Sequence, residues 1–189
     1  MAKRRSSPRS KKTVARGAKK AAPRKAKTAA RRIRVQAVPS GFHTLTAHLT
    51  VGDGNQAVDF YKRAFGAKEV ARMPAPDGSL MHAELKIGNS MIMLAGEMPG
   101  GSKSPKSLGG SPVTLNLYVS DADDFFMRAV QAGARVTMPL ANQFWGDRYG
   151  QLEDPFGHIW AVATHIENLT PQEMMKRAQA AFSAPRPQG

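Results

Sequence analysis

The sequence contains an internal repeat in which two similar segments lie 68 residues apart. Residues 48–53 read His-Leu-Thr-Val-Gly-Asp and residues 116–121 read Asn-Leu-Tyr-Val-Ser-Asp, so the offset is 116 − 48 = 68. Each segment ends in an aspartate that can begin a helix, and each predicted helix stops at a Gly-Ala pair, at Gly66 and Gly133. Such a repeat predicts two copies of one small module. A binding site formed between two copies would have equivalent positions on both sides.

Basic residues are concentrated at the N-terminus. Residues 1–39 contain 15 of the 28 lysines and arginines and none of the 14 acidic residues. The remaining residues carry 13 basic and 14 acidic side chains, so the formal charge of +14 arises from the first segment. Because this segment also has few large apolar side chains, it cannot bury a core, and we expect a disordered tail. The two parts therefore need separate functional interpretations.

The tail is rich in Lys, Ala and Pro, and its composition is similar to that of linker-histone tails and some bacterial nucleoid proteins. This composition favours binding to the nucleic-acid backbone by charge neutralisation, independent of base sequence and strongly dependent on salt. The residues expected to make these contacts are Lys3, Arg4, Arg5, Lys11, Lys12, Lys19, Lys20, Arg24, Lys25, Arg31 and Arg32. The alternatives are a localisation signal read by a receptor and a solvated extension without a specific partner.

Composition also disfavours several protein classes. The sequence has no cysteine, so neither a disulfide framework nor a thiolate metal site can form. No run approaches about 18 apolar residues, so we expect no membrane span. The basic N-terminus lacks the apolar segment of a secretory signal. We therefore expect a cytoplasmic protein, associated with the nucleoid if its tail binds DNA.

Residues 40–169 are predicted to form one domain from the modules 44–96 and 112–166, each with the order strand, helix and three strands. The expected strands cover residues 45–51, 68–73, 80–87, 91–95, 113–119, 135–138, 149–153 and 158–164. The expected helices end near residues 65 and 133, and residues 97–112 are predicted to be a connector rich in Gly, Ser, Pro and Lys.

Residues 170–189 are predicted to form a short C-terminal helix followed by a tail. Thr170 and Glu173 have the spacing of a capping box, with proline at the first helical position between them. The helix itself is expected over residues 174–182.

The doubled module order and several motifs resemble the vicinal oxygen chelate superfamily, which contains glyoxalase I, fosfomycin-resistance proteins, extradiol dioxygenases and bleomycin-binding proteins. Two of these motifs are Asp-Phe-Tyr-Lys-Arg-Ala-Phe-Gly at 59–66 and Glu-Asp-Pro-Phe-Gly-His-Ile-Trp at 153–160. The segments 41–44, 81–85 and 143–150 are similar to those of the PhnB-like branch. The resemblance implies an α+β fold in which two βαβββ modules form a cupped, eight-stranded mixed sheet, often in a homodimer.

In catalytic members of the superfamily, four strands each contribute one metal ligand, drawn from His, Gln and Glu. The resemblance places these four positions at Thr46, Met93, Thr114 and Ala161, and the repeat agrees because 114 − 46 and 161 − 93 both equal 68. Threonine, methionine and alanine are not a ligand set for Mg²⁺, Mn²⁺ or Zn²⁺. We therefore expect no metal and no other cofactor.

A ligand pocket is still expected in the cup. Because strand residues two apart share a face, His48 should lie beside Thr46 and Asn116 beside Thr114. The predicted pocket is mostly apolar with a few polar anchors, which is typical of small-molecule sites. Its predicted lining is Thr46, His48, Met93, Thr114, Asn116, Trp145, Arg148, Tyr149 and Ala161.

Two pocket residues have specific expected roles. Arg148 could hold a carboxylate or phosphate through two parallel hydrogen bonds, and Trp145 could stack on a planar ligand. The structural alternative is that Asp147 and Arg148 only pin the loop.

Three residues are candidates for acid–base chemistry. His82 and Glu84 lie two apart on one expected strand and so share a face, and His48 is the candidate base within the pocket. The alternatives are a solvated or salt-bridged strand face for the pair and a packing role for His48.

Taken together, the sequence predicts a metal-free small-molecule-binding protein with a basic tail that binds nucleic acid. A metal-dependent lyase, isomerase or dioxygenase of the glyoxalase type is one alternative. The other is a nucleic-acid-associated protein in which the folded part is an inert, dimerising scaffold.

Overall fold

The computed structural model describes residues 35–183, and a compact unit of the chain begins at Gln36. The expected disorder of the tail and its eleven candidate nucleic-acid-binding residues lie outside the described residues. Among the residues described, no helix is long and apolar enough to cross a membrane.

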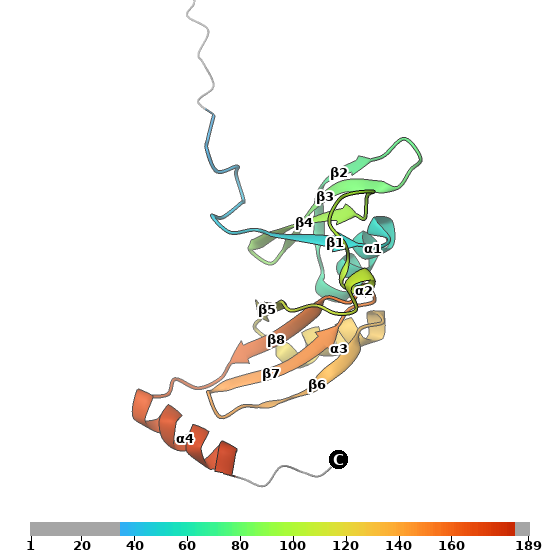
Figure 1. The fold of residues 1–189 in the computed structure, drawn as a ribbon. Coiled ribbons are helices and arrows are strands. Elements are labelled where there is room, and N and C mark those ends of the chain that lie inside the picture. Colours follow the sequence, from blue (N-terminus) through green and yellow to red (C-terminus); the bar gives the residue numbers. More distant parts are fainter. Residues whose placement is uncertain (1–34, 184–189) are drawn as a thin grey trace, which may run out of the picture. The chain divides into compact units, whose positions relative to one another are not determined.

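Two modules with the predicted order make up the fold (Figure 1). The first contains β1 (Ala47–Val51), α1 (Gly54–Phe65), β2 (Lys68–Pro74), β3 (Leu80–Ile87) and β4 (Ser90–Gly96). The second contains β5 (Thr114–Tyr118), α3 (Ala122–Ala132), β6 (Arg135–Asn142), β7 (Asp147–Glu153) and β8 (Ile159–His165). The α+β class and the two βαβββ modules are confirmed.

The eight strands divide into two four-stranded sheets with the same topology. The first sheet has the order β1-β4-β3-β2 and the second has the order β5-β8-β7-β6. In each sheet the first strand of the module is parallel to the last, and the other neighbours are antiparallel. The repeat in the sequence therefore corresponds to a repeat in hydrogen-bonding topology.

The two principal helices begin and end in the same way. Asp53 and Asp121 are the N-caps, and each side chain accepts a hydrogen bond at 3.0 Å from the backbone N–H three residues later. Gly66 and Gly133 end the helices at φ values of 62° and 114°, a region that glycine adopts without steric cost. Both ends were predicted from the repeated sequence pattern.

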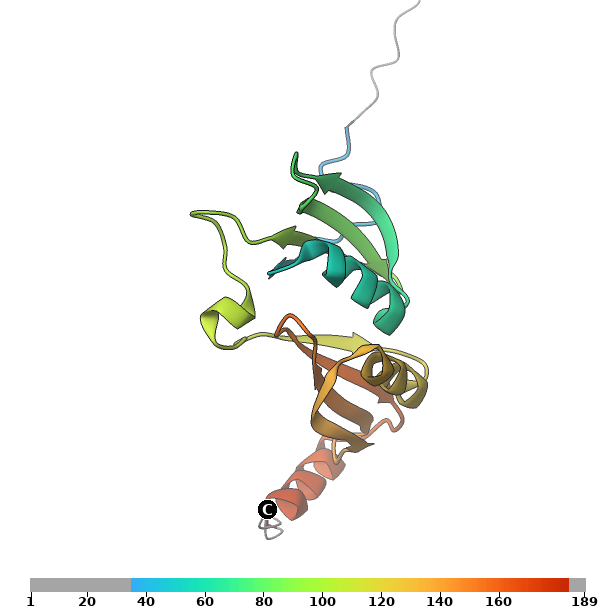
Figure 2. The same cartoon turned by 90° about the vertical axis from the view of Figure 1, so that its right-hand side faces the viewer.

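The core lies where the two helices meet. Helix α1 packs on the first sheet, α3 packs on the second, and the two helices contact each other (Figure 2). Phe65 of α1 stacks on Phe125 of α3 with 5.6 Å between ring centroids, and it contacts the indole of Trp160 at 4.6 Å. All three are buried. This aromatic cluster joins the modules through one continuous hydrophobic core.

A buried carboxylate completes the joint between the modules. Asp154 accepts hydrogen bonds from the hydroxyl of Tyr61 at 2.7 Å and from the indole N–H of Trp160 at 2.8 Å. Its other oxygen accepts the backbone N–H groups of Phe156 and His158, both at 2.9 Å. Because each oxygen accepts two hydrogen bonds, the Asp-Pro-Phe-Gly turn is held against α1 without an unpaired buried charge.

Several predicted boundaries differ from the structure. The connector contains a one-turn helix, α2 (Pro105–Leu108), which begins at the N-cap Ser104. The second strand of the second module, β6, extends to Asn142, past a register shift that a strictly alternating pattern does not predict. Helix α4 (Pro171–Ser183) begins three residues earlier than expected. The predicted capping box is confirmed, since the Glu173 carboxylate accepts the Thr170 backbone N–H at 2.9 Å.

Candidate functional site

Each sheet buries one face under its helix, and the opposite face is called the outer face here. On β1, Leu49 and Val51 point into the core, so His48 and Thr50 lie on the outer face. The same alternation places the predicted candidates His82 and Glu84 of β3 on that face. The first outer face therefore holds three candidate polar groups on β1 and β3, the two strands that flank β4.

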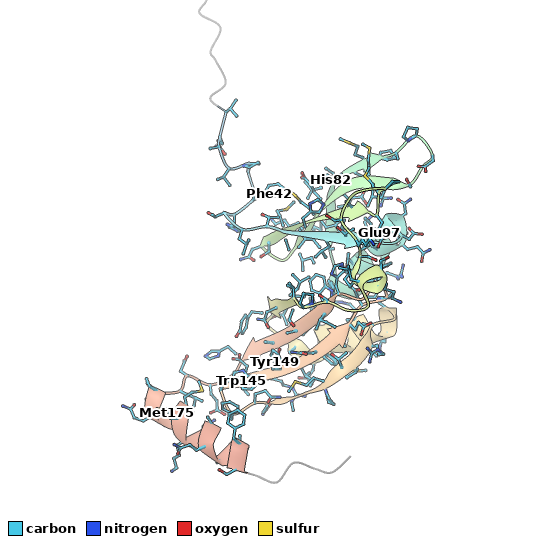
Figure 3. The ribbon with its side chains drawn as sticks, viewed as in Figure 1. Phe42, His82, Glu97, Trp145, Tyr149 and Met175 are labelled. Atoms are coloured by element: carbon cyan, nitrogen blue, oxygen red, sulfur yellow. The ribbon has the colours of Figure 1, made fainter. Side chains whose placement is uncertain are left out.

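These three groups are brought together across the first sheet. Met93 pairs in register with His48 on one side and with Glu84 on the other. The rings of His48 and His82 meet edge to face with 5.8 Å between centroids, and Nε2 of His82 lies 3.7 Å from Oε1 of Glu84. Figure 3 labels His82 on this sheet. The spacing of His82 and Glu84 predicted their shared face, whereas the approach of His48 depends on the strand order.

The second outer face carries an equivalent row of side chains, which runs across three adjacent strands. Asn116 pairs with Ala161, and Ala161 pairs with Gln151. Gln151 therefore takes the place that Glu84 has in the first sheet, and its side-chain amide donates to the hydroxyl of Tyr149 at 2.7 Å. The sequence patterns did not single out Gln151, although the register of the repeat identifies it.

The two rows stay on separate sheets. Of the predicted pocket residues, Thr46, His48 and Met93 belong to the first module, whereas Thr114, Asn116, Trp145, Arg148, Tyr149 and Ala161 belong to the second. A cavity of about 300 Å³ has His48 in its wall and includes neither Asn116 nor Tyr149. The common pocket therefore remains a prediction.

Trp145 and Tyr149 lie together at the start of β7, with 5.5 Å between ring centroids (Figure 3). The indole N–H of Trp145 donates to the carboxylate of Asp147 at 3.1 Å. Asp147 is buried and also accepts from the hydroxyl of Tyr118 at 2.9 Å and contacts Nδ1 of His165 at 2.7 Å. Hydrogen bonding to Asp147 is the main cause that raises the pKa values of Tyr118 and His165.

The guanidinium of Arg148 is already engaged. It forms two parallel hydrogen bonds to the carboxylate of Asp123, at the start of α3, and a third to Asn142 at 3.1 Å. These contacts with Asp123 lower the pKa of that carboxyl and raise the pKa of Arg148. The sequence suggested that Asp147 and Arg148 could hold the loop in place as a pair. In the structure these two residues bind different partners.

The chain is similar in sequence to a known superfamily. Residues 41–162 match the model of the Glyoxalase/Bleomycin resistance protein/Dioxygenase superfamily. The chain belongs to this superfamily. It is 46% identical over 144 residues to an uncharacterized protein of Mycobacterium tuberculosis, a match that covers 74% of this chain and 82% of the relative.

Solved structures of other proteins share the fold. The crystal structure of TioX from Micromonospora sp. ML1 has 31% sequence identity and a TM-score of 0.53, covering 65% of this chain and 98% of TioX. A PhnB protein from Bacillus cereus has 17% identity and a TM-score of 0.52, covering 65% of this chain and 99% of that protein. At that identity the second likeness shows the shared fold alone.

The superfamily implies a metal centre, and the four equivalent positions here do not fit one. Thr46 and Thr114 offer neutral hydroxyls, Met93 offers a soft thioether, and Ala161 has no donor atom. Met93 and Ala161 take equivalent places in the two sheets, since Met93 pairs with His48 and Ala161 pairs with Asn116, whereas Thr46 lies just before β1. Within residues 35–183, no group of three or more His, Asp or Glu side chains is placed to hold a metal ion. The donor set at these positions therefore supports no reaction step through a metal.

Proposed function

We propose that this superfamily member binds a small organic molecule on its outer sheet faces, without a metal at the four usual positions. The observation that carries the proposal is the cluster of His48, His82 and Glu84 beside Met93. A few convergent polar groups among adaptable apolar side chains are typical of small-molecule sites.

The first experiment is elemental analysis of the purified full chain after expression with added Zn, Mn, Ni and Fe. The proposal expects far less than one metal per chain. About one metal per chain would contradict the donor argument and support a metal-dependent glyoxalase-type enzyme.

Binding itself can be tested with metal-free bleomycin, a probe suggested by the description of the superfamily. Saturable binding in calorimetry should weaken at least about tenfold on replacement of His82 by Ala, the loss expected for one hydrogen bond to a charged partner. His43→Ala is the matched control, because His43 is exposed and precedes β1. If both variants bind alike, the probe does not use this face, and a ligand must be sought by NMR screening.

The same cluster supports a second candidate function, a metal-independent acid–base enzyme. Glu84 lies close enough to His82 to orient its ring, and His48 offers a second imidazole. Such a site would exchange a proton next to a carbonyl group, with proton transfer between the substrate carbon and an imidazole nitrogen. Deuterium uptake from D₂O by methylglyoxal or pyruvate should then depend on His82 and not on His43.

We further propose that the basic tail binds nucleic acid without sequence preference. The support is the concentration of Lys and Arg in residues 1–39. Fluorescence anisotropy with a duplex of about 20 base pairs should show affinity falling about 10³–10⁵-fold from about 50 to 200 mM salt if 6–10 phosphates are contacted. A chain lacking residues 1–34 should lose DNA binding and keep small-molecule binding. Loss of both would contradict a two-part protein.

We also propose that the chain is a homodimer. Its support is the uncovered polar surface of both outer faces, where His48 and Asn116 are exposed and His82, Glu84 and Gln151 are half-buried, so that a second copy could cover them. Light scattering after size exclusion should give twice the chain mass. The mass of a single chain at working concentrations would contradict the proposed homodimer.

A further inference from the structure

A cavity of about 300 Å³ is lined by β1, an edge strand of the first sheet, by the connector that carries α2, and by Leu115 and His158 of the second module. Its size is within the range of small-ligand sites. We propose that it binds an apolar molecule that carries one carboxylate group. The cavity shares His48 with the first outer face, but most of its other lining residues belong to the connector, so the proposal can be tested apart from binding at the outer faces.

The walls of the cavity are largely apolar, and part of that surface is uncovered. Leu108 of α2 and Val113 before β5 line the cavity, although 65% and 58% of their surfaces are exposed. Leu49 and Leu115 line it from the two strands. An apolar ligand would remove this surface from water, which is favourable in proportion to the area buried.

One lining side chain, Lys103, is positively charged. Lys103 and the imidazole of His48 line the cavity, and none of its lining residues is acidic. Within residues 35–183, Lys103 forms no ion pair. The nearby carboxylate of Glu97 is engaged by the backbone N–H of Ser104 at 2.6 Å. Lys103 is near enough to contribute to the lowered pKa of Glu97, but within residues 35–183 it makes no close ion pair, so its ammonium group can bind a ligand carboxylate.

The connector that forms one wall of the cavity is fixed by specific contacts. Ser104 is buried, and its hydroxyl caps α2 by accepting the backbone N–H of Ser107 at 3.4 Å. Gly157 packs so closely on α2 that a Cβ atom there would lie 3.0 Å from Cβ of Pro105. From the same turn, Nε2 of His158 hydrogen-bonds to the carbonyl oxygen of Thr50 at 3.1 Å, which joins the turn to β1. Contacts among α2, the turn at Gly157 and His158, and β1 therefore fix the walls of the cavity.

Octanoate and 1-octanol form a matched pair of probes, since they share the apolar chain and differ in the charged head. We expect saturable binding of octanoate to the full chain with Kd below about 1 mM, and weaker binding of 1-octanol. Lys103→Gln should weaken octanoate about tenfold and leave 1-octanol unchanged, as expected for loss of one charge-assisted hydrogen bond. Lys106→Gln is the control, because Lys106 belongs to the same connector, within α2, and does not line this cavity.

A second variant tests the apolar wall. Leu108 is exposed, so Leu108→Gln should fold normally and weaken both probes. In NMR spectra, octanoate should shift the amide signals of Gly110 and Ser111 and leave those of Gln151 unchanged. The proposal is overturned if neither probe saturates, if 1-octanol binds as tightly as octanoate, or if Lys103→Gln and Lys106→Gln behave alike. Shifts confined to the outer faces would also overturn it, and would be evidence for the proposed function alone.

Discussion

The hydroxyl of Tyr61 donates a hydrogen bond of 2.7 Å to Asp154, a residue 93 positions later in the chain. The bond links α1 of the first module to the turn before β8 of the second. Burial, and then the charge of Asp154, raises the pKa of Tyr61, so the phenol keeps its proton and remains a donor. The two modules are therefore joined by a hydrogen bond from a neutral phenol to a buried carboxylate.

Removing that donor should destabilise the whole fold. Tyr61→Phe keeps the ring and leaves one oxygen of Asp154 with one donor fewer, so we expect a loss of about 1–3 kcal/mol. Urea unfolding followed by circular dichroism measures it. The control is Tyr149→Phe, whose half-buried hydroxyl accepts one bond from Gln151 and should matter less. Equal losses in the two variants would contradict a special role for the tie.

The repeat, both helix ends and the alternation of the strands were predictable because they depend on local rules. A short polar N-cap, a glycine with positive φ and a period of two each act within a few residues. The shared face of His82 and Glu84 followed in the same way. The offset of 68 residues is also seen in the strand register, where His48 pairs with Met93 and Asn116 pairs with Ala161.

The Asp147 cluster was not predictable by such rules. Its donors come from β5, from the loop before β7 and from the end of β8, so they meet only through the strand order. Similarly, the sequence left open whether Arg148 binds a ligand or pins the loop, because nothing local indicated that Asp123, 25 residues earlier, lies within reach. Long-range pairs between polar side chains require the topology, which the repeat alone did not determine.

Gly146 should tolerate no side chain. Its φ is +94°, and a Cβ atom would lie 2.5 Å from the carbonyl oxygen of Glu167. Gly146→Ala should therefore cost more than about 1 kcal/mol through combined strain and clash. Gly78→Ala separates these two causes, since Gly78 has φ +82° and a Cβ atom added there would meet no other atom within 4 Å. Thermal unfolding of both variants should show the larger loss for Gly146→Ala.

The ion pairs of β2 predict a limited loss of stability in acid. Glu69 accepts from Arg72 at 2.8 Å and from Lys62 at 2.5 Å, and these hydrogen bonds lower its pKa from 4.5 to about 2. Because the folded-state pKa is depressed, the contribution is complete above the unfolded value of 4.5 and is lost as pH falls toward 2. As the pairs are partly exposed, Glu69→Gln should cost less than about 1 kcal/mol at neutral pH. A variant whose stability falls as steeply as that of the parent chain between those two pH values would contradict this assignment.

His165 predicts the opposite dependence on pH. Its ring contacts Asp147 through Nδ1 and Asn168 through Nε2, at 2.7 and 3.0 Å, and hydrogen bonding to Asp147 is the main cause of its raised pKa. The contribution to stability is therefore complete below the unfolded value of 6.5 and is lost as pH rises through the higher folded-state pKa. Asp147→Asn should bring the His165 pKa, followed by its ring proton shifts in NMR, back toward 6.5. A His165 titration that Asp147→Asn leaves unchanged would show that another group holds the imidazolium.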